Sequence, residues 1–161
     1  MASKVRVYGK AQNRTALGIA HAYMVMYPQA TLEDLRNAFP NELNPDKGTK
    51  ENFILATEKG TDANWDGYFR AEDELLTTGN NLRVSVAKMW TKPSLERIVN
   101  HAVQYGIEIK LVDFLDSKSK KKGFYLEFLN GFSPDKSDKD NTKLNFITLL
   151  FIYIKKLLGI K

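Results

Sequence analysis

The spacing of apolar residues predicts alternating short strands and helices over the first 129 residues. Strands show apolar residues with a period of two, whereas a helix that packs on one side repeats them about every three to four positions. The clearest helical stripe lies within residues 94–105. In chain order we expect a strand at 5–8, helices at 14–27 and 32–39, a short third helix at 51–59, a hairpin from 68–77 and 82–86, a helix at 94–105, and strands at 107–111 and 124–129.

Turn and capping residues mark the boundaries of these elements. Pro28 ends the first helix, and Thr31 with Asp34 three positions later matches a capping box that begins the second. Gly106 stands where a glycine commonly ends a helix. The residues 78–81, Thr-Gly-Asn-Asn, have the composition of a tight turn and should join the arms of the hairpin. In its second arm we expect three inward side chains: Leu82, Val84 and Val86.

The order of the elements predicts an α+β fold. A helix–turn–helix pair, a third helix and a hairpin follow one another in the order of a winged helix, before a further amphipathic helix and strand. We expect an α+β core domain over residues 1–129 and a flexible linker over 130–142, which is rich in small and polar residues. An apolar docking helix is predicted at 143–161.

The segment 143–161 is apolar around most of its helical circumference. Twelve of its nineteen residues are large and apolar, four are lysine and none is acidic. At about 100° per residue, its polar residues fall in one arc that only Ile152 interrupts: Asn145, Thr148, Lys155, Lys156 and Gly159. Its length is marginal for a membrane span, which needs about twenty predominantly apolar residues, and two lysines lie inside it.

We therefore expect this helix to dock rather than to span a bilayer. Its partner could be the body of the protein, a second copy, another protein or an anionic membrane surface. Burial in the same chain or self-association is favoured over lipid, because the bulky side chains suit a shared core. The predicted interaction residues are Leu144, Ile147, Leu150, Phe151, Ile154 and Leu158.

Composition excludes several kinds of chemistry. The chain is 43% hydrophobic and 27% charged, as in ordinary globular proteins. It has no cysteine, which excludes disulfides, thiolate catalysis and zinc sites built on cysteine. The N-terminal sequence MASKVRVYGKAQNR has no apolar stretch typical of a secretory signal. We therefore expect a cytoplasmic location.

The net charge of +5 is unevenly distributed. Residues 1–32 carry four basic residues and no acid, whereas residues 61–80 carry five acids and one arginine. Duplex binding draws much of its affinity from lysine and arginine on phosphates, but the predicted third helix has two acids and one lysine. Solubility alone also explains the excess charge. The candidate nucleic-acid-binding residues are Arg6, Lys10, Arg14, Arg83, Lys88 and Lys92.

One pattern carries a hint of catalysis. Glu108 and Lys110 share a face of a predicted strand, and two carboxylates with a lysine can hold Mg²⁺ in one class of nucleases. Asp66 and Asp73 are the candidate second acids, but a helix separates their hairpin from this strand. Simple strand alternation explains the pattern equally well, so catalysis is disfavoured.

Other potential sites have simpler interpretations. Trp90, which could stack on a base, is expected to fill the corner between strand and helix instead. His21 and His101 lie eighty residues apart without metal-ligand spacing. The sequence has no glycine-rich phosphate loop and no nucleophile motif. No cofactor or metal is therefore expected.

Three stretches of the chain together resemble a small uncharacterised bacterial domain. They are YPQATLEDLRNAFP (27–40), LRVSVAKMW (82–90) and SLERIVNHAVQYGIEIKL (94–111). Such domains look like accessory modules beside restriction-type or other defence proteins. This chain has Lys-Met-Trp-Thr at 88–91 where that pattern has Gln-Trp-Gly. The resemblance implies a bacterial, defence-associated context and assigns no catalytic residue.

Two function classes follow from these patterns. The first is a non-catalytic accessory module, associated with nucleic acid and winged-helix-like, in a regulatory or defence context. The alternative is a protein–protein interaction or oligomerisation module, whose C-terminal helix docks a partner, a second copy or, less favoured, a membrane surface. A Mg²⁺-dependent nuclease is a third, disfavoured reading.

Overall fold

The computed structural model divides the chain into two units, Met1–Gly131 and Phe132–Lys161. The sequence pattern places the end of the core domain two residues earlier, after residue 129. The structure describes residues 2–46, 48–57, 65–110, 123–134, 150 and 153–159. The first unit contains two small sheets and all the named helices, in a mixed α+β arrangement.

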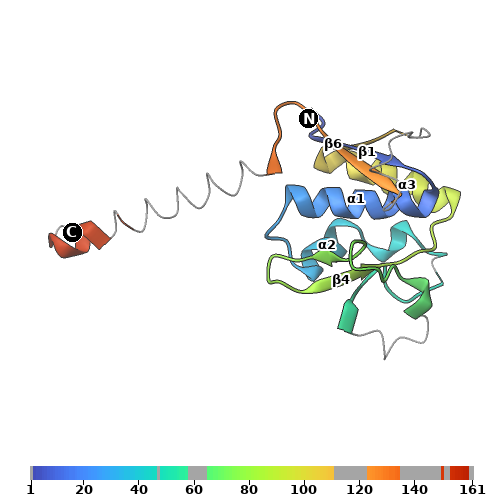
Figure 1. The fold of residues 1–161 in the computed structure, drawn as a ribbon, viewed down its shortest axis with the longest axis horizontal. Coiled ribbons are helices and arrows are strands. Elements are labelled where there is room, and N and C mark those ends of the chain that lie inside the picture. The colour runs from blue at the N-terminus through green and yellow to red at the C-terminus, as the bar shows by residue number, and fades with distance from the viewer. Residues whose placement is uncertain are drawn as a thin grey trace. The chain divides into compact units, whose positions relative to one another are not determined.

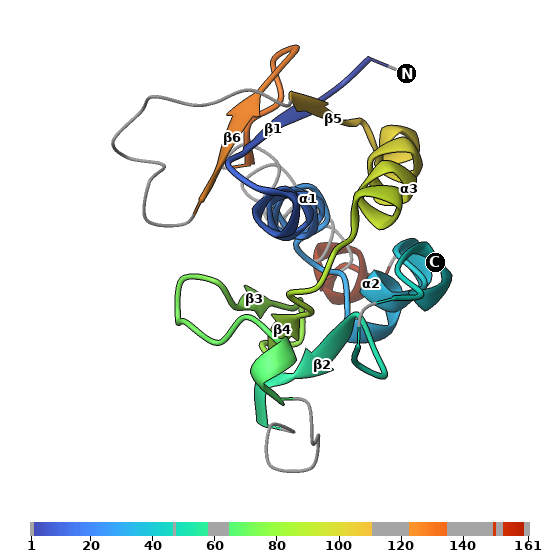
Figure 2. The ribbon, with the colours of Figure 1, turned by 90° about the vertical axis from the view of Figure 1, so that its right-hand side faces the viewer.

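Helix α1 (Gln12–Met26) runs through the middle of the first unit. Nine of its fifteen residues are buried, and residues 15–20 are buried without interruption. An uninterrupted run covers every face of a helix, so α1 is surrounded rather than half-exposed. Figures 1 and 2 show α1 with strands β1 and β6 on one side and with α2 and β4 on the other.

The first sheet has the strand order β5-β1-β6. Its central strand β1 (Val5–Gly9) is parallel to β5 (Ile107–Lys110) and antiparallel to β6 (Phe124–Phe128). Val5 and Val7 are fully buried, as their alternation predicts. The three strands were all expected, but their pairing was not.

The second sheet has the order β2-β4-β3, with antiparallel pairs throughout. It consists of β2 (Phe53–Leu55), β4 (Arg83–Val86) and the short β3 (Leu76–Thr77). Residues 84–86 of the central strand β4 are all buried, so both faces of this strand are covered.

Two further helices close the first unit. Helix α2 (Leu32–Ala38) begins with the predicted capping box, in which the Asp34 amide donates to Thr31 and the Asp34 carboxylate accepts from the Thr31 amide. Helix α3 (Lys92–Ala102) continues into the 3₁₀ turn η4 (Val103–Tyr105). Gly106 then takes a left-handed conformation with φ of 74°, as predicted for the end of this helix. Shorter 3₁₀ turns are η1 (Asn41–Leu43) and η3 (Trp65–Gly67).

The expected third helix at 51–59 is wrong. Residues 53–55 form strand β2 instead, and Phe53 and Ile54 are both buried. A short continuous apolar run fits a strand covered on both faces as well as it fits a helix. The pairing with β4 therefore decides the conformation.

The hairpin was predicted only in part. Leu82 is 40% exposed rather than inward, because it belongs to the turn, where its amide donates to the Thr78 hydroxyl. Val84 and Val86 are fully buried, as expected. The first arm is short: of residues 68–77, Tyr68 forms a single bridge to Ala87, and only Leu76–Thr77 form a strand.

In the second unit, residue 150 and residues 153–157 are helical, and the Leu158 amide donates to the Ile154 carbonyl oxygen. Most of the predicted linker and the first part of the predicted docking helix lie outside the described residues. So does the charged loop at 117–122. Among the helices of the described residues, none is long and apolar enough to cross a membrane.

A close contact between α1 and the first sheet supplies a stability test. A Cβ atom on Gly18 would lie 2.6 Å from Val7 Cγ1 and 3.1 Å from Phe124 Cβ. Alanine is a better helix former by up to about 1 kcal/mol, but a contact this short forces a shift that costs about 1–3 kcal/mol. We expect Gly18→Ala to lower the free energy of unfolding, measured by urea denaturation.

A double-mutant cycle isolates this contact. Val7→Ala removes the atom that the new methyl group would meet, so the G18A change should cost less in the V7A background than alone. An equal cost in both backgrounds would show that Gly18 is not needed for close packing on Val7.

Candidate nucleic-acid interface

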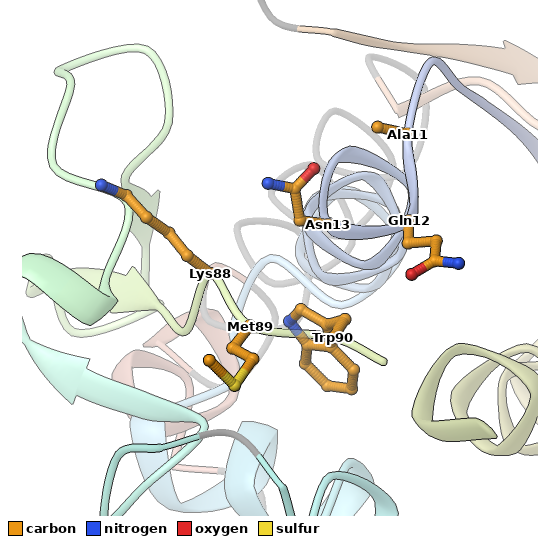
Figure 3. Close-up of a pocket in the computed structure, with 6 residues that line it drawn as sticks. All are labelled: Ala11, Gln12, Asn13, Lys88, Met89 and Trp90. Carbon is orange, nitrogen blue, oxygen red and sulfur yellow. The ribbon is translucent and has the colours of Figure 1, made fainter. Parts of the chain in front are cut away.

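An open depression of about 500 Å³ lies where α1 begins. One wall is the start of α1, and the other is the segment that leads from β4 to α3 (Figure 3). Among the described residues, none that lines it is acidic. The lining residues are Ala11, Gln12, Asn13, Lys88, Met89 and Trp90.

A tight turn from β1 into α1 fixes the first wall. A Cβ on Gly9 would lie 1.8 Å from Thr15 Oγ1, so only glycine fits here without a shift. The buried Thr15 hydroxyl in turn donates to the Ala11 carbonyl oxygen at 2.9 Å. These contacts hold the strand end directly against the first turn of the helix.

The start of α1 favours an anion. Its N-cap residue Ala11 provides no side-chain hydrogen bond, and the first turn contains no acid. The first amides of a helix have no partner within the helix, and they form the positive end of its dipole. Gln12 and Asn13 add side-chain amides beside them, and Figure 3 shows Asn13 on the side of α1 nearer to Lys88.

The second wall is anchored in the core. Trp90 is only 4% exposed, and its indole Nε1 donates to the Ala87 carbonyl oxygen at 2.8 Å. It therefore fills the corner between β4 and α3, as expected, and offers little surface for base stacking. The Lys88 amide donates to the Gly67 carbonyl oxygen at 2.7 Å, while Met89 is 53% exposed.

The start of α3 adds a second helix N-terminus close in sequence to the lining residue Trp90. Helix α3 begins at Lys92, two residues after Trp90, and its first turn also contains no acid. Lys10 immediately precedes Ala11 on the other wall. Within the described part of the chain, Lys10, Lys88 and Lys92 form no ion pair. All three ammonium groups are therefore available to an external anion.

The other three predicted phosphate-binding residues are arginines that carboxylates already bind. Arg6 Nε lies 2.7 Å from Glu108 Oε1, and Arg83 Nη2 lies 2.6 Å from Glu72 Oε1. Arg14 lies 3.6 Å from a Glu74 oxygen. Within the described residues, the six predicted residues are thus of two kinds: lysines without an ion pair and arginines with one. Of the six, Lys88 lines the depression, Lys10 and Arg14 directly flank its lining in sequence, and Lys92 follows Trp90 by two residues.

The Glu108–Lys110 pattern occupies the outer face of the first sheet. In the strand register Arg6 stands between Glu108 on β5 and Glu127 on β6. It contacts both carboxylates, at 2.7 Å and 3.3 Å. An arginine between two carboxylates occupies the place that a cation would take.

The candidate second acids are elsewhere. Asp66 lies in η3 and pairs with Arg70 at 2.9 Å, and Asp73 lies in a turn before β3. Neither belongs to the sheet that holds Glu108. Across the described ranges, no three acidic or histidine side chains come together in a way that could hold a metal ion.

Both histidines contact backbone oxygens. His21 Nε2 lies 3.1 Å from the Glu74 carbonyl oxygen, and His101 Nε2 lies 2.7 Å from that of Ala38. The ring of His101 also packs near Phe39 and Tyr105. The His101 contacts join α3 to the end of α2, and the His21 contact joins α1 to the segment before β3, so both histidines have a structural role.

Comparisons with protein-family models, with curated proteins and with solved structures found no match for this chain. The resemblance to a defence-associated bacterial domain therefore stays a prediction.

Sequence reasoning missed Gln12, Asn13 and the partner role of Glu127. The only signal for the first two was Gly9 followed by a helix without a capping residue. Glu127 could not be found, because its partners are more than one hundred residues away in the sequence.

The side chains on the outer face of the first sheet, Arg6, Tyr8 and Glu127, lead to a prediction about the pH dependence of stability. The Tyr8 hydroxyl donates to Glu127 and, with Arg6 and Lys110, holds the pKa of Glu127 below its ordinary value. A lowered pKa stabilises the fold above the unfolded-state pKa, and this contribution disappears as the pH falls through the folded-state pKa. We expect Tyr8→Phe to raise the pKa of Glu127, measured by carboxyl carbon NMR titration, and to move acid unfolding to higher pH.

Tyr125→Phe is the matched control. Tyr125 lies opposite Tyr8 in the register, but Glu127 accepts its hydrogen bond from Tyr8. A Glu127 pKa that is the same in Y8F and in the unmodified protein would contradict the assignment.

Proposed function

We propose that this chain is a non-catalytic accessory module that binds nucleic acid by contacting the phosphates of the nucleic-acid backbone. The observation that carries the proposal is the depression at the start of α1, which no acid among the described residues lines. Lys88 is in its lining, Lys10 and Lys92 are close to the lining in sequence, and none of the three forms an ion pair with a described residue. Helix starts and lysines are common phosphate ligands. A regulatory or defence context belongs to the proposal only through the resemblance described above.

Backbone binding without base reading fits this site best. Among the described lining residues the one aromatic side chain is Trp90, which is buried and so offers no exposed ring for stacking. Helix α2 has two acids in its first turn, which disfavours it as a helix that enters the major groove. The winged-helix-like arrangement is supported by the α1–α2 pair and the β3–β4 hairpin, but strand β2 stands where the third helix was expected.

A salt titration tests the proposal. Each phosphate contact contributes about 0.9 to the slope of log affinity against log salt for duplex DNA, and about 0.7 for single strands. We expect fluorescence anisotropy with labelled DNA or RNA to show salt-dependent binding. Lys10→Gln, Lys88→Gln and Lys92→Gln should each weaken binding and lower the slope by about one contact.

Lys4→Gln is the charge-matched control, because Lys4 precedes β1 whereas Lys10 follows it. Arg83→Gln should also have a smaller effect than K88Q, since Arg83 is already paired with Glu72. Binding that is absent or independent of salt, or equal losses in K4Q and K88Q, would remove the proposal.

A further inference from the structure

The described part of the C-terminal unit presents an apolar stripe to solvent. Its members occupy helical positions i, i+3, i+4, i+7 and i+8, which lie on one side of a helix. They are 44–72% exposed, and they are Leu150, Tyr153, Ile154, Leu157 and Leu158. Three of these five residues, Leu150, Ile154 and Leu158, belong to the predicted interaction set.

Positive charge occupies the other side. At about 100° per residue, Lys155 and Lys156 point away from the stripe, and both are exposed. Gly159 follows with a left-handed φ of 64°, after the helical residues end. The sequence 143–161 contains four lysines and no acid. Every charged side chain of this segment is therefore positive.

These two features together point to an anionic lipid surface. We propose that the C-terminal helical segment lies in the interface of an anionic membrane, with the stripe in the acyl boundary and Lys155 and Lys156 at the level of the phosphates. Lipid phosphates complement a segment that carries only positive charge.

The width of the apolar face separates this proposal from self-association. A two-helix seam needs only a narrow apolar stripe. The sequence pattern of 143–161, placed on a predicted helix, has apolar residues over most of the circumference and polar residues in one arc. A helix embedded in an interface can bury such a broad face, whereas a pair of helices would leave much of it in water.

The test is sedimentation of the full chain with vesicles. One set is phosphatidylcholine alone, and the other is an equal mixture of phosphatidylcholine and phosphatidylglycerol. We expect binding to the anionic vesicles only. K155Q with K156Q should weaken it about thirtyfold, since each lysine near a charged surface supplies most of a factor of ten. Leu157→Gln with Leu158→Gln should weaken it more than about a hundredfold.

Two controls make the result decisive. K4Q with R97Q removes two exposed charges from the first unit and should leave vesicle binding unchanged. A chain that ends at Asp140 should lose vesicle binding but keep any nucleic-acid binding, so this proposal and the proposed function can fail separately.

Three outcomes would overturn the proposal. The first is a full chain that stays in the supernatant with anionic vesicles. The second is equal binding by the chain that ends at Asp140. The third is a dimer, shown by light scattering, that depends on Leu157 and Leu158 and does not bind vesicles. That last result would assign the stripe to a second copy instead.

Discussion

Helix α1 has no face turned fully to water along residues 15–20, and the rest of the first unit is arranged to cover it. The sheet β5-β1-β6 covers one side, at a distance so short that Gly18 leaves no room for a methyl group. The second sheet and helices α2 and α3 cover the remainder. Small residues on α1, among them Ala16, Ala20 and Ala22, allow this close approach on several sides at once.

The same constraint positions the candidate interface. Because β1 turns into α1 through Gly9, the first turn of α1 is held at the end of the central strand. Burial of Trp90 beside α1 brings the segment before α3 to the same place. The depression thus results from core packing, and only its outer residues, such as Lys88, are free to meet a ligand. The arginines, by contrast, join neighbouring strands or loops through carboxylates.

Local elements were predictable from the sequence to the extent that local chemistry determines them. The capping box of α2 and the glycine at the end of α3 require only neighbours in sequence, and both predictions were confirmed. Strand β2 was missed because Phe53 and Ile54 are strand residues only when β4 covers them. The candidate site was predictable only in part. The lysines were identified by their charge. Which basic residues are already paired depends on Glu72, Glu74, Glu108 and Glu127, whose positions in space the sequence does not reveal.

The parallel pairing of β1 with β5 also governs when this unit can form. Strand β1 precedes both of its neighbours in the chain, because they lie in residues 107–128. Until those residues are made, β1 has no partner strand on either edge, and α1 lacks the sheet that covers one of its sides. Contacts between distant segments slow folding and prolong exposure of apolar surface. A growing chain must therefore carry an uncovered apolar helix until residues 107–128 have been made and the sheet can close over it.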